Sequence, residues 1–465
     1  MSTDRVTHDE GTSMNAKTER RNRWTFAVGT VGRDMVYTLV SLYFIVYLTE
    51  VLNLADDTLW WVTTLILAAR LFDAVMDIVM GAVVDNTRTR WGHYKPWILI
   101  GSVASAIFTV LMFTDLGLRG AGFVAAFAAI YLGWGLAWTA NDIPYWSMLP
   151  ALTLDQKQRE RIGALAKIFA TVGLFTVVVA IIPVTNALGG DQHAWFLFAG
   201  ALCLIMVAGQ AVTLFGVKEP DIVVEQERTN LRELASVVFK NDQLLWTAIS
   251  MVLFMTGYVT TTSFGVYFFK YAYRDENMYA PFAAILGVAQ LLGYALFPVF
   301  SKRFTRRVLY TGATVVIVLG YVIFFFAPMN MIWIGLAGLL LFMGQSFVTL
   351  LMLVFITDTI EYGQWKLGRR NGAVTFALQP FINKVGAALG TQIVGITVIV
   401  SGINAAKTPA DVTAEGLLTM KLAMLVLPLV LIVAGYLVYR AKYKIDVAFY
   451  ERIVAELKER GQVVG

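Results

Sequence analysis

Long apolar runs separated by short polar segments make up most of this chain of 465 residues. A membrane-spanning helix needs about 20 mostly apolar residues. Twelve runs meet that length, near 24–50, 59–84, 96–115, 121–147, 162–187, 194–217, 243–271, 279–300, 308–327, 329–357, 373–401 and 416–440. The pattern predicts an all-α polytopic membrane protein with twelve transmembrane helices in two six-helix halves.

Polar segments divide the chain into five parts. These are a cytoplasmic N-terminal tail (1–23), an N-terminal six-helix half (24–217), a cytoplasmic linker (218–242), a C-terminal six-helix half (243–440) and a cytoplasmic C-terminal tail (441–465). The first 23 residues are polar and charged, which predicts a disordered tail rather than a cleavable signal peptide. Six plus six helices with a central linker are the plan of the major facilitator fold, in which two parallel halves enclose a site at mid-membrane depth.

Basic residues are distributed unevenly between the loops on the two sides. One side carries Arg88, Arg90 and Lys95, then Lys157, Arg159 and Arg161, then Lys302, Arg303, Arg306 and Arg307, and then Lys366, Arg369 and Arg370. The loops on the other side carry only Arg119, Arg274 and Lys407. Because cytoplasmic loops are enriched in Lys and Arg, both termini and the linker are expected in the cytoplasm.

Composition agrees with a membrane protein and excludes several other classes. The chain is 58% hydrophobic and 15% charged, with a mean hydropathy of +0.66, whereas soluble domains have about 25% charged residues. Its net charge of +5 lies in short loops, which favours contact with lipid headgroups over nucleic acid. The single cysteine excludes an internal disulfide and, with three histidines, leaves no plausible zinc cluster. We expect no cofactor.

The second span carries charges that a lipid-facing helix would not tolerate. Arg70, Asp73 and Asp77 follow the spacing i, i+3 and i+7 and so share one helix face. A carboxylate near the centre of a span costs about 2.5 to 3.5 kcal/mol. Such residues normally face a polar interior and mark the path of an ion or a substrate. The alternative is a set of ion pairs that only hold helices together.

Other spans add polar residues at similar depth. Asp34 lies about 15 Å into the first span, after Arg33. In the fourth span, Trp138, Asp142 and Trp146 share one face at i, i+4 and i+8, and Pro144 is expected to break that helix. In the eleventh span, Lys384 lies near mid-membrane depth, shortly after Pro380.

The residue types suggest a division of roles. Two carboxylates one turn apart, Asp73 and Asp77, suit a hard cation or a shared proton, and Thr139 offers a hydroxyl oxygen. An aspartate between two indole rings suits a sugar, because the carboxylate accepts bonds from hydroxyl groups and the rings pack on C–H groups. Most of the 12 tryptophans are expected to serve in packing or in the membrane-interface belt.

Three motifs resemble the glycoside–pentoside–hexuronide:cation symporter family, the family of the melibiose permease, within the major facilitator superfamily. They are ARLFDAVMDIVMGAVVDNTRTRWGHYKPWILIG, NDIPYWSMLPALTLDQKQRER and ITDTIEYGQWKLGRRN. The resemblance implies a coupling-cation site that contains Asp73, Asp77 and Thr139, which would be metal ligands if the ion is Na+. It implies a sugar site formed by Arg33, Asp34, Trp138, Asp142, Trp146, Lys167, Gln379 and Lys384.

The chain also departs from this family pattern. Lys167 replaces an arginine, Trp138 a tyrosine and Thr349 a tryptophan, and Pro380 stands where a hydroxyl residue is expected, which weakens the case for a galactoside. Met76 replaces an asparagine that helps to coordinate sodium. A thioether is a poor ligand for a hard cation, so we expect H+ coupling or weakened sodium selectivity.

We expect a monomeric, multi-pass transporter of the bacterial inner membrane. Ion pairs between the basic loop 85–95 and the polar segment 358–371 are expected to close its cytoplasmic side. The gating residues expected are Arg70, Asp85, Arg88, Arg90, Asp358 and Glu361. The substrate stays open among pentosides, hexuronides and oligosaccharides. Alternatives are a Na+-coupled sugar symporter and a lysolipid carrier, with Lys384 as headgroup ligand. A sensor or an intramembrane enzyme is disfavoured, because no HExxH, GxSxG or P-loop motif occurs.

Overall fold

The computed structural model of the chain describes residues 16–152, 156–218, 236, 238–368, 372–406 and 408–460. All long elements in these ranges are helices, and eleven helical segments are long and apolar enough to cross a membrane. A further long helix, α3 (Asp56–Asn86), contains the predicted span with Arg70, Asp73 and Asp77. The predicted fold class is therefore confirmed.

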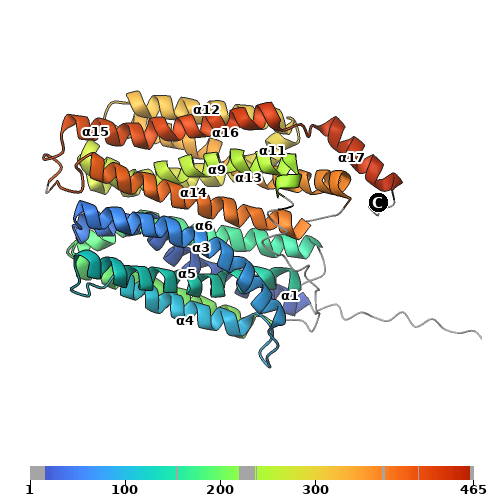
Figure 1. Ribbon diagram of the computed structural model, residues 1–465, viewed down its shortest axis with the longest axis horizontal. Helices are drawn as coiled ribbons and strands as arrows, with labels where there is room; N and C mark the ends of the chain where they lie inside the picture. The colour runs from blue at the N-terminus through green and yellow to red at the C-terminus, as the bar shows by residue number, and fades with distance from the viewer. Residues whose placement is uncertain are drawn as a thin grey trace, which may run out of the picture.

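Each half consists of long helices, some of which are interrupted by short π-helical segments. The N-terminal half contains α1 (Ala16–Thr38), η1 (Leu39–Tyr43), α2 (Phe44–Val46), η2 (Tyr47–Val51), α3, α4 (Lys95–Met112), α5 (Gly120–Ala151), α6 (Gln156–Ala187) and α7 (Gln192–Gly216). The C-terminal half contains α9 (Asp242–Ser263), α10 (Gly265–Tyr267), η3 (Phe268–Ala272), η4 (Glu276–Met278), α11 (Tyr279–Ser301), α12 (Arg306–Phe326), α13 (Met331–Leu367), α14 (Gly372–Val400), α15 (Ala414–Lys421), η5 (Leu422–Val426) and α16 (Leu427–Lys442). A last helix, α17 (Val447–Glu459), follows the bundle (Figure 1).

The two halves pack on each other chiefly through α3 with α14 and α6 with α11. Glycines allow these approaches. A Cβ atom on Gly395 of α14 would lie 2.3 Å from the Thr63 side chain of α3, and one on Gly287 of α11 would lie 2.9 Å from Phe175 of α6. Small residues at helix interfaces are typical of membrane bundles because they bring the backbones close together.

We call the end of the bundle that holds the start of α1 and α17 the near end, and the opposite end the far end (Figure 1). At the far end the halves bind each other through polar groups. The Glu50 carboxylate forms an ion pair with Lys270 and accepts bonds from the Tyr271 hydroxyl at 2.8 and 3.0 Å. The hydroxyls of Tyr43 and Tyr279 lie 2.6 Å apart. The far end is therefore closed.

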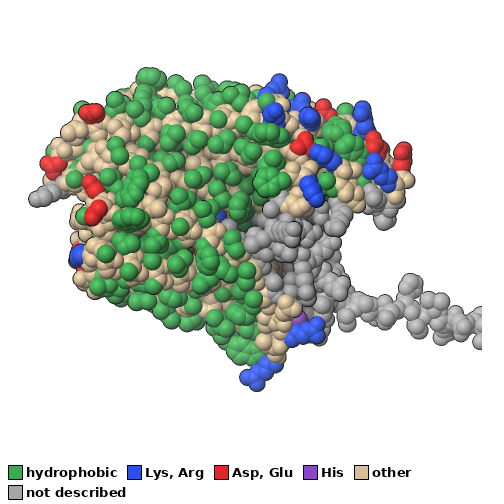
Figure 2. Space-filling view, viewed as in Figure 1, with side chains coloured by type: hydrophobic (Ala, Val, Ile, Leu, Met, Phe, Trp, Pro, Cys, Tyr) green, Lys and Arg blue, Asp and Glu red, His purple; other side chains and the backbone are tan. Residues whose placement is uncertain are grey.

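At the near end, the ion pairs of the described residues join groups of the same half. Asp358 forms an ion pair with Arg306 and accepts a bond from the Tyr443 hydroxyl at 3.2 Å. Lys366 Nζ lies 2.5 Å from Asp242 Oδ1. Lysine and arginine side chains gather at this end on the face shown in Figure 2.

Residues 16–23, expected to belong to a disordered tail, instead form the first turns of α1. The reason is tertiary: Asn22 is buried, and its amide donates to the Lys218 carbonyl at 3.0 Å. The predicted C-terminal tail likewise contains α17, which packs on α13. There the Trp365 indole donates to Glu456 at 2.7 Å. Residues 1–15 lie outside the described ranges.

Candidate functional site

The charged face of α3 meets both halves of the molecule. The Thr139 hydroxyl of α5 donates to Asp77 Oδ1 at 2.9 Å, and Lys384 Nζ of α14 donates to Asp77 Oδ2 at 2.5 Å. The side chains of Asp77 and Lys384 are 15% and 14% exposed, so this ion pair is largely buried. A single carboxylate thus connects the two halves in the middle of the bundle.

Asp73 lies one turn from Asp77 and is 7% exposed. Its Oδ1 atom has no hydrogen-bond partner among the described residues. It lies against Gly135 of α5, where a Cβ atom would be 2.3 Å away. The charges that act on Asp73 are those of Lys384, Arg70 and Asp77. A buried carboxylate oxygen without a donor can bind a cation or a proton, since leaving it unpaired is costly.

Arg70 supports this cluster from the far side. Its guanidinium donates to the Ser41 hydroxyl of η1 at 3.3 Å, and the residue is 4% exposed. Arg70 also interacts electrostatically with Asp73. Three charged groups on one face of α3 are therefore held together as the i, i+3, i+7 spacing predicts, with Arg70 as a partner of the acidic pair.

A second cluster lies where α1 faces α5. Arg33 is 2% exposed and forms an ion pair with Asp142. Its guanidinium carbon lies 4.5, 5.4 and 5.7 Å from the ring centroids of Tyr145, Trp138 and Trp146, respectively. Cation–π contacts at such distances hold the guanidinium in a fixed orientation. The Nε and Nη1 atoms of Arg33 have no hydrogen-bond partner among the described residues, so this cluster retains donors for a ligand.

Asp34 and Lys167 complete the second cluster. Asp34 is half-buried, and the charges that act on it are those of Arg33, Lys167 and Asp142. The Lys167 ammonium lies 4.9 Å from the Trp146 ring, and its side chain is exposed. Six of the predicted sugar-site residues therefore lie together, with carboxylates, cations and aromatic rings on neighbouring helices.

The expectation that Pro144 breaks the fourth span is wrong. The helix α5 runs without interruption from Gly120 to Ala151. An interior proline removes one hydrogen bond and crowds the carbonyl four residues earlier, but here packing of the neighbouring residues holds the helix. The Tyr145 hydroxyl, for example, donates to the Phe26 carbonyl of α1. Continuity of α5 keeps Trp138, Asp142 and Trp146 in the predicted register.

The remaining predicted residues lie apart from these clusters. Gln379 is half-buried on α14, and no hydrogen bond or ion pair in the described part of the chain links it to the charged groups. Arg88 and Arg90 are exposed in the loop after α3, and Glu361 is half-buried. Asp358 is bound to Arg306 within its own half. The side chain of Asp85 lies outside the described residues.

Several residues of the site and of the far-end closure have no counterpart among the sequence predictions. Tyr145 covers the Arg33 guanidinium, and Tyr37 contacts Trp138 with ring centroids 5.2 Å apart and the rings tilted by 31°. Tyr145 lies inside the quoted motif NDIPYWSMLPALTLDQKQRER, three residues after Asp142, so helical spacing from Asp142 predicts that it shares the same face. Glu50 and Lys270 carry no such signal, because single charges near helix ends are common.

Comparison with known proteins identifies the family of this chain. The sequence model of the family described as MFS/sugar transport protein matches residues 25–447. The lactose permease of Lactobacillus helveticus is 31% identical over 460 residues, which covers 94% of this chain and 71% of that permease. The raffinose carrier protein of Pediococcus pentosaceus is 31% identical over 455 residues, with the same two coverages.

Solved structures agree on the fold. The nucleoside transporter NupG superposes with a TM-score of 0.62 at 16% identity, over 92% of this chain and 100% of that chain. A bacterial homologue of the lysosomal transporter Spinster superposes with a TM-score of 0.64 at 13% identity, over 97% of this chain and 100% of that chain. These likenesses concern the fold alone. With a family match over almost its whole length, this chain belongs to the MFS/sugar transport protein family.

Proposed function

We propose that this chain is a cation-coupled symporter that carries a sugar, glycoside or hexuronide into the cell by alternating access, with H+ favoured over Na+. The observation that carries the proposal is the position of Asp77, held between Thr139 of its own half and Lys384 of the other. The relatives named as lactose and raffinose carriers support a sugar as the substrate.

The near end is assigned to the cytoplasm. It contains the basic loops, and cytoplasmic loops of membrane proteins are enriched in Lys and Arg. The far end then faces the outside and is closed by Glu50, Lys270, Tyr43 and Tyr279. In this assignment the structure corresponds to a carrier that is shut toward the outside, as after delivery of its substrate.

Coupling follows from competition for the acidic pair. When Lys384 is bound to Asp77, its positive charge, which comes from the other half, partly neutralises the acidic pair Asp73 and Asp77. A coupling cation at Asp73 and Asp77 replaces that counter-charge and releases Lys384, so the halves are free to separate at mid-depth. Binding of the cation thereby favours a different arrangement of the halves, which is the requirement for coupled transport.

The oxygen set around Asp77 favours a proton. The described oxygens come from Asp73, Asp77 and Thr139, and Met76 is one of the three residues between the two aspartates. Hard cations favour oxygen ligands over a thioether, whereas a proton needs one carboxylate oxygen. The test measures sugar uptake and external pH together, with and without sodium. If sodium stimulates uptake at constant pH and the medium does not become alkaline, the proposed preference for H+ is wrong.

The cluster around Arg33 is assigned to the sugar. Asp34 and Asp142 accept bonds from hydroxyl groups, and the Trp146 ring packs on C–H groups. A panel of sugars tested by competition uptake identifies the substrate, and Trp146→Ala should lower affinity for whichever sugar competes. If no sugar in the panel competes while a lysolipid does, sugar symport is wrong. Lysolipid carriage is disfavoured because Lys384, the expected headgroup ligand, is bound to Asp77.

A further inference from the structure

Two arginines lie at the near end of two neighbouring helices of the C-terminal half. The helices α12 and α16 pack side by side along one edge of the bundle (Figure 1). They run in opposite directions, so the first turn of α12, with Arg307, and the last turn of α16, with Arg440, reach the same end. We call the surface formed by these arginines and by Val308, Gly312, Val315 and Leu437 the α12/α16 surface.

A pair of hydroxyl groups fixes the spacing of the two helices at this point. Thr311 Oγ1 and Tyr436 Oη lie 2.8 Å apart. Arg307 precedes Thr311 by four residues, and so lies one turn nearer the near end on the same side of α12. Arg440 follows Tyr436 by four residues and has the same relation to it on α16. Because Arg307 Nη2 also donates to the Tyr443 carbonyl at 3.4 Å, its guanidinium is directed toward the end of α16.

Neither Arg307 nor Arg440 has an acidic partner among the described residues. The neighbouring Arg306 does have one, since it forms an ion pair with Asp358. Arg307 is half-buried and lies at the start of α12, where the helix dipole disfavours a cation and favours an anion. An external anion would stabilise both guanidinium groups, and phosphate matches the arrangement of their donors.

Toward the far end from the arginines, the α12/α16 surface is apolar. Val308 and Val315 of α12 are each 52% exposed, and Leu437 of α16 is 56% exposed. Between the two valines, a Cβ atom on Gly312 would meet no atom within 4 Å, so the surface of α12 is open there. Figure 2 shows Lys and Arg side chains over the near ends of these helices and hydrophobic side chains along the rest. The surface therefore suits an occupant with an anionic head and an apolar body.

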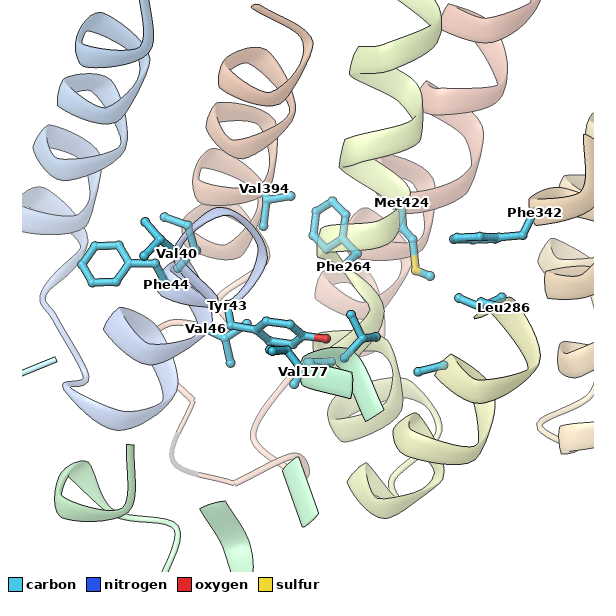
Figure 3. Packing of buried hydrophobic residues seen from close by; sticks show 14 of the residues in the cluster. Val40, Tyr43, Phe44, Val46, Val177, Phe264, Leu286, Phe342, Val394 and Met424 are labelled. Carbon is cyan, nitrogen blue, oxygen red and sulfur yellow. The ribbon is translucent and has the colours of Figure 1, made fainter. Parts of the chain in front are cut away.

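The inner side of α16 is fixed in the bundle. Toward the far end α16 continues into η5, where Met424 is 1% exposed. In Figure 3, Met424 lies with Phe342 among the buried hydrophobic residues. Nearer the near end, a Cβ atom on Gly435 would lie 2.7 Å from the Ser250 carbonyl oxygen of α9. Arg440 is therefore attached to a rigid element, as a selective site requires.

We propose that the α12/α16 surface binds one anionic phospholipid of the membrane leaflet at the near end. Its phosphate lies between Arg307 and Arg440, and an acyl chain lies along α12 over Gly312. The occupant is a lipid rather than a free phosphate, because the apolar surface continues directly from the arginines. This site is separate from the proposed sugar and cation sites, so it does not depend on which solute the protein carries.

The test measures lipid binding to the delipidated full-length chain in detergent by native mass spectrometry. The probes are phosphatidylglycerol, which is anionic, and phosphatidylcholine, which has no net charge, both with palmitoyl and oleoyl chains. Each basic residue near a membrane surface contributes about fivefold to binding of an anionic lipid. We expect the first phosphatidylglycerol to bind at least about tenfold more tightly than the first phosphatidylcholine.

Charge variants locate this preference. Arg307→Gln combined with Arg440→Gln should weaken binding of phosphatidylglycerol at least about tenfold. Lys302→Gln combined with Arg303→Gln is the matched control, because it removes the same charge from exposed positions just before α12. The control should lose less than about threefold, since its side chains add only to the general surface charge. If the first variant does not fold, Arg440→Gln alone removes an exposed guanidinium and should lose about fivefold.

A second pair of variants tests the apolar part of the site. Gly312→Phe fills the open position on α12 without changing any charge, and we expect it to weaken phosphatidylglycerol binding measurably. Gly200→Phe is the control, because a Cβ atom on Gly200 of α7 likewise meets no atom within 4 Å. It should leave the affinity unchanged.

Three results would overturn the proposal, and each leaves sugar symport intact. Equal affinities for the two lipids would show that the surface has no preference for an anionic headgroup. Equal losses in the two double variants would indicate a diffuse positive surface rather than a site. Displacement of the lipid by glycerol phosphate, together with no effect of Gly312→Phe, would identify a site for a free anion.

Discussion

At the far end of the interface, side chains of the two halves bind one another, whereas the ion pairs described at the near end lie within one half. Glu50 binds Lys270 and Tyr271 across 220 and 221 residues of sequence, from the N-terminal half to the C-terminal half. At the near end, Asp358 binds Arg306 and Lys366 binds Asp242, all in the C-terminal half. Ion pairs at the far end therefore hold the two halves together, whereas those at the near end join helices of the C-terminal half.

The far-end closure consists of a few polar contacts whose net free energies are small. It is formed where the first helix of each half ends in a π-helical segment, η2 in one case and η3 in the other. Apart from the ion pair, it consists of hydroxyl contacts such as Tyr43 with Tyr279, and Thr49 with Tyr267 at 2.7 Å. Each such bond contributes about 1 kcal/mol net. An exchange between states by modest motion is compatible with these energies.

The ion pair between Asp77 and Lys384 joins the two halves between the far and near ends. Of the changes predicted here, Asp77→Asn should have the largest effect on transport. Removing one partner of a buried ion pair costs about 3 to 5 kcal/mol, which is a factor of about 10² to 4 × 10³ in an equilibrium constant. Lys384 would keep its charge without a partner. We expect concentrative uptake of the bound glycoside by membrane vesicles to fall at least 100-fold.

The double variant Asp77→Asn with Lys384→Met is the control, because it removes both charges. Glycoside binding should recover to within about tenfold of the unmodified protein, while cation-driven accumulation stays absent. If the double variant binds no better than Asp77→Asn alone, Lys384 is not the energetic partner of Asp77.

This pattern explains how much of the site could be predicted from the sequence. The face of α3 and the Trp138–Asp142–Trp146 register follow from helical spacing, and the structure places both as expected. The expectation for Pro144 fails because the local effect of proline on a helix is outweighed by the packing of α5. The contact of Glu50 with Lys270 joins residues 220 positions apart. This contact depends on how the two halves pack on each other, and helical periodicity within one segment does not predict that packing.

The second prediction breaks the far-end closure. Glu50→Gln removes an ion pair whose side chains are 9% and 27% exposed. Because hydrogen bonds to charged groups contribute about 1.5 to 3 kcal/mol and partial exposure lowers this, we expect about a tenfold shift toward the outward-open state. The reporter is Thr262→Cys, in the wall of a cavity of about 280 Å³ between the two halves. It is placed in a Cys203→Ala background and labelled from outside by an impermeant maleimide.

The matched control is Asp115→Asn. Asp115 and Arg119 form an ion pair at the same end but within the N-terminal half. Loss of that pair should leave the labelling rate unchanged. A labelling rate for Glu50→Gln equal to that of Asp115→Asn would show that the far-end pair does not hold the halves together.

Tyr279→Phe should have a smaller effect of the same sign. It removes one neutral hydrogen bond between the halves, to Tyr43. At about 1 kcal/mol, labelling of the introduced cysteine should rise about three- to fivefold. Tyr321→Phe removes an equally short hydroxyl contact, with Thr261, inside the C-terminal half and should leave the rate unchanged. Equal rates in the two variants would contradict the idea that contacts across the halves set the conformation.

The smallest effect is expected at the near end, and its sign is opposite. Arg88 is exposed in this conformation, and we expect it to pair across the halves only when the far end opens. Because exposed ion pairs contribute about 0.2 to 1 kcal/mol, Arg88→Gln should lower the labelling rate about twofold, most clearly in the Glu50→Gln background. Arg119→Gln, an exposed arginine at the far end, is the matched control. A higher labelling rate in Arg88→Gln would mean that the loop after α3 does not close the cytoplasmic side. Ion pairs that form across the halves at the near end when the far end opens would then have to involve residues other than Arg88.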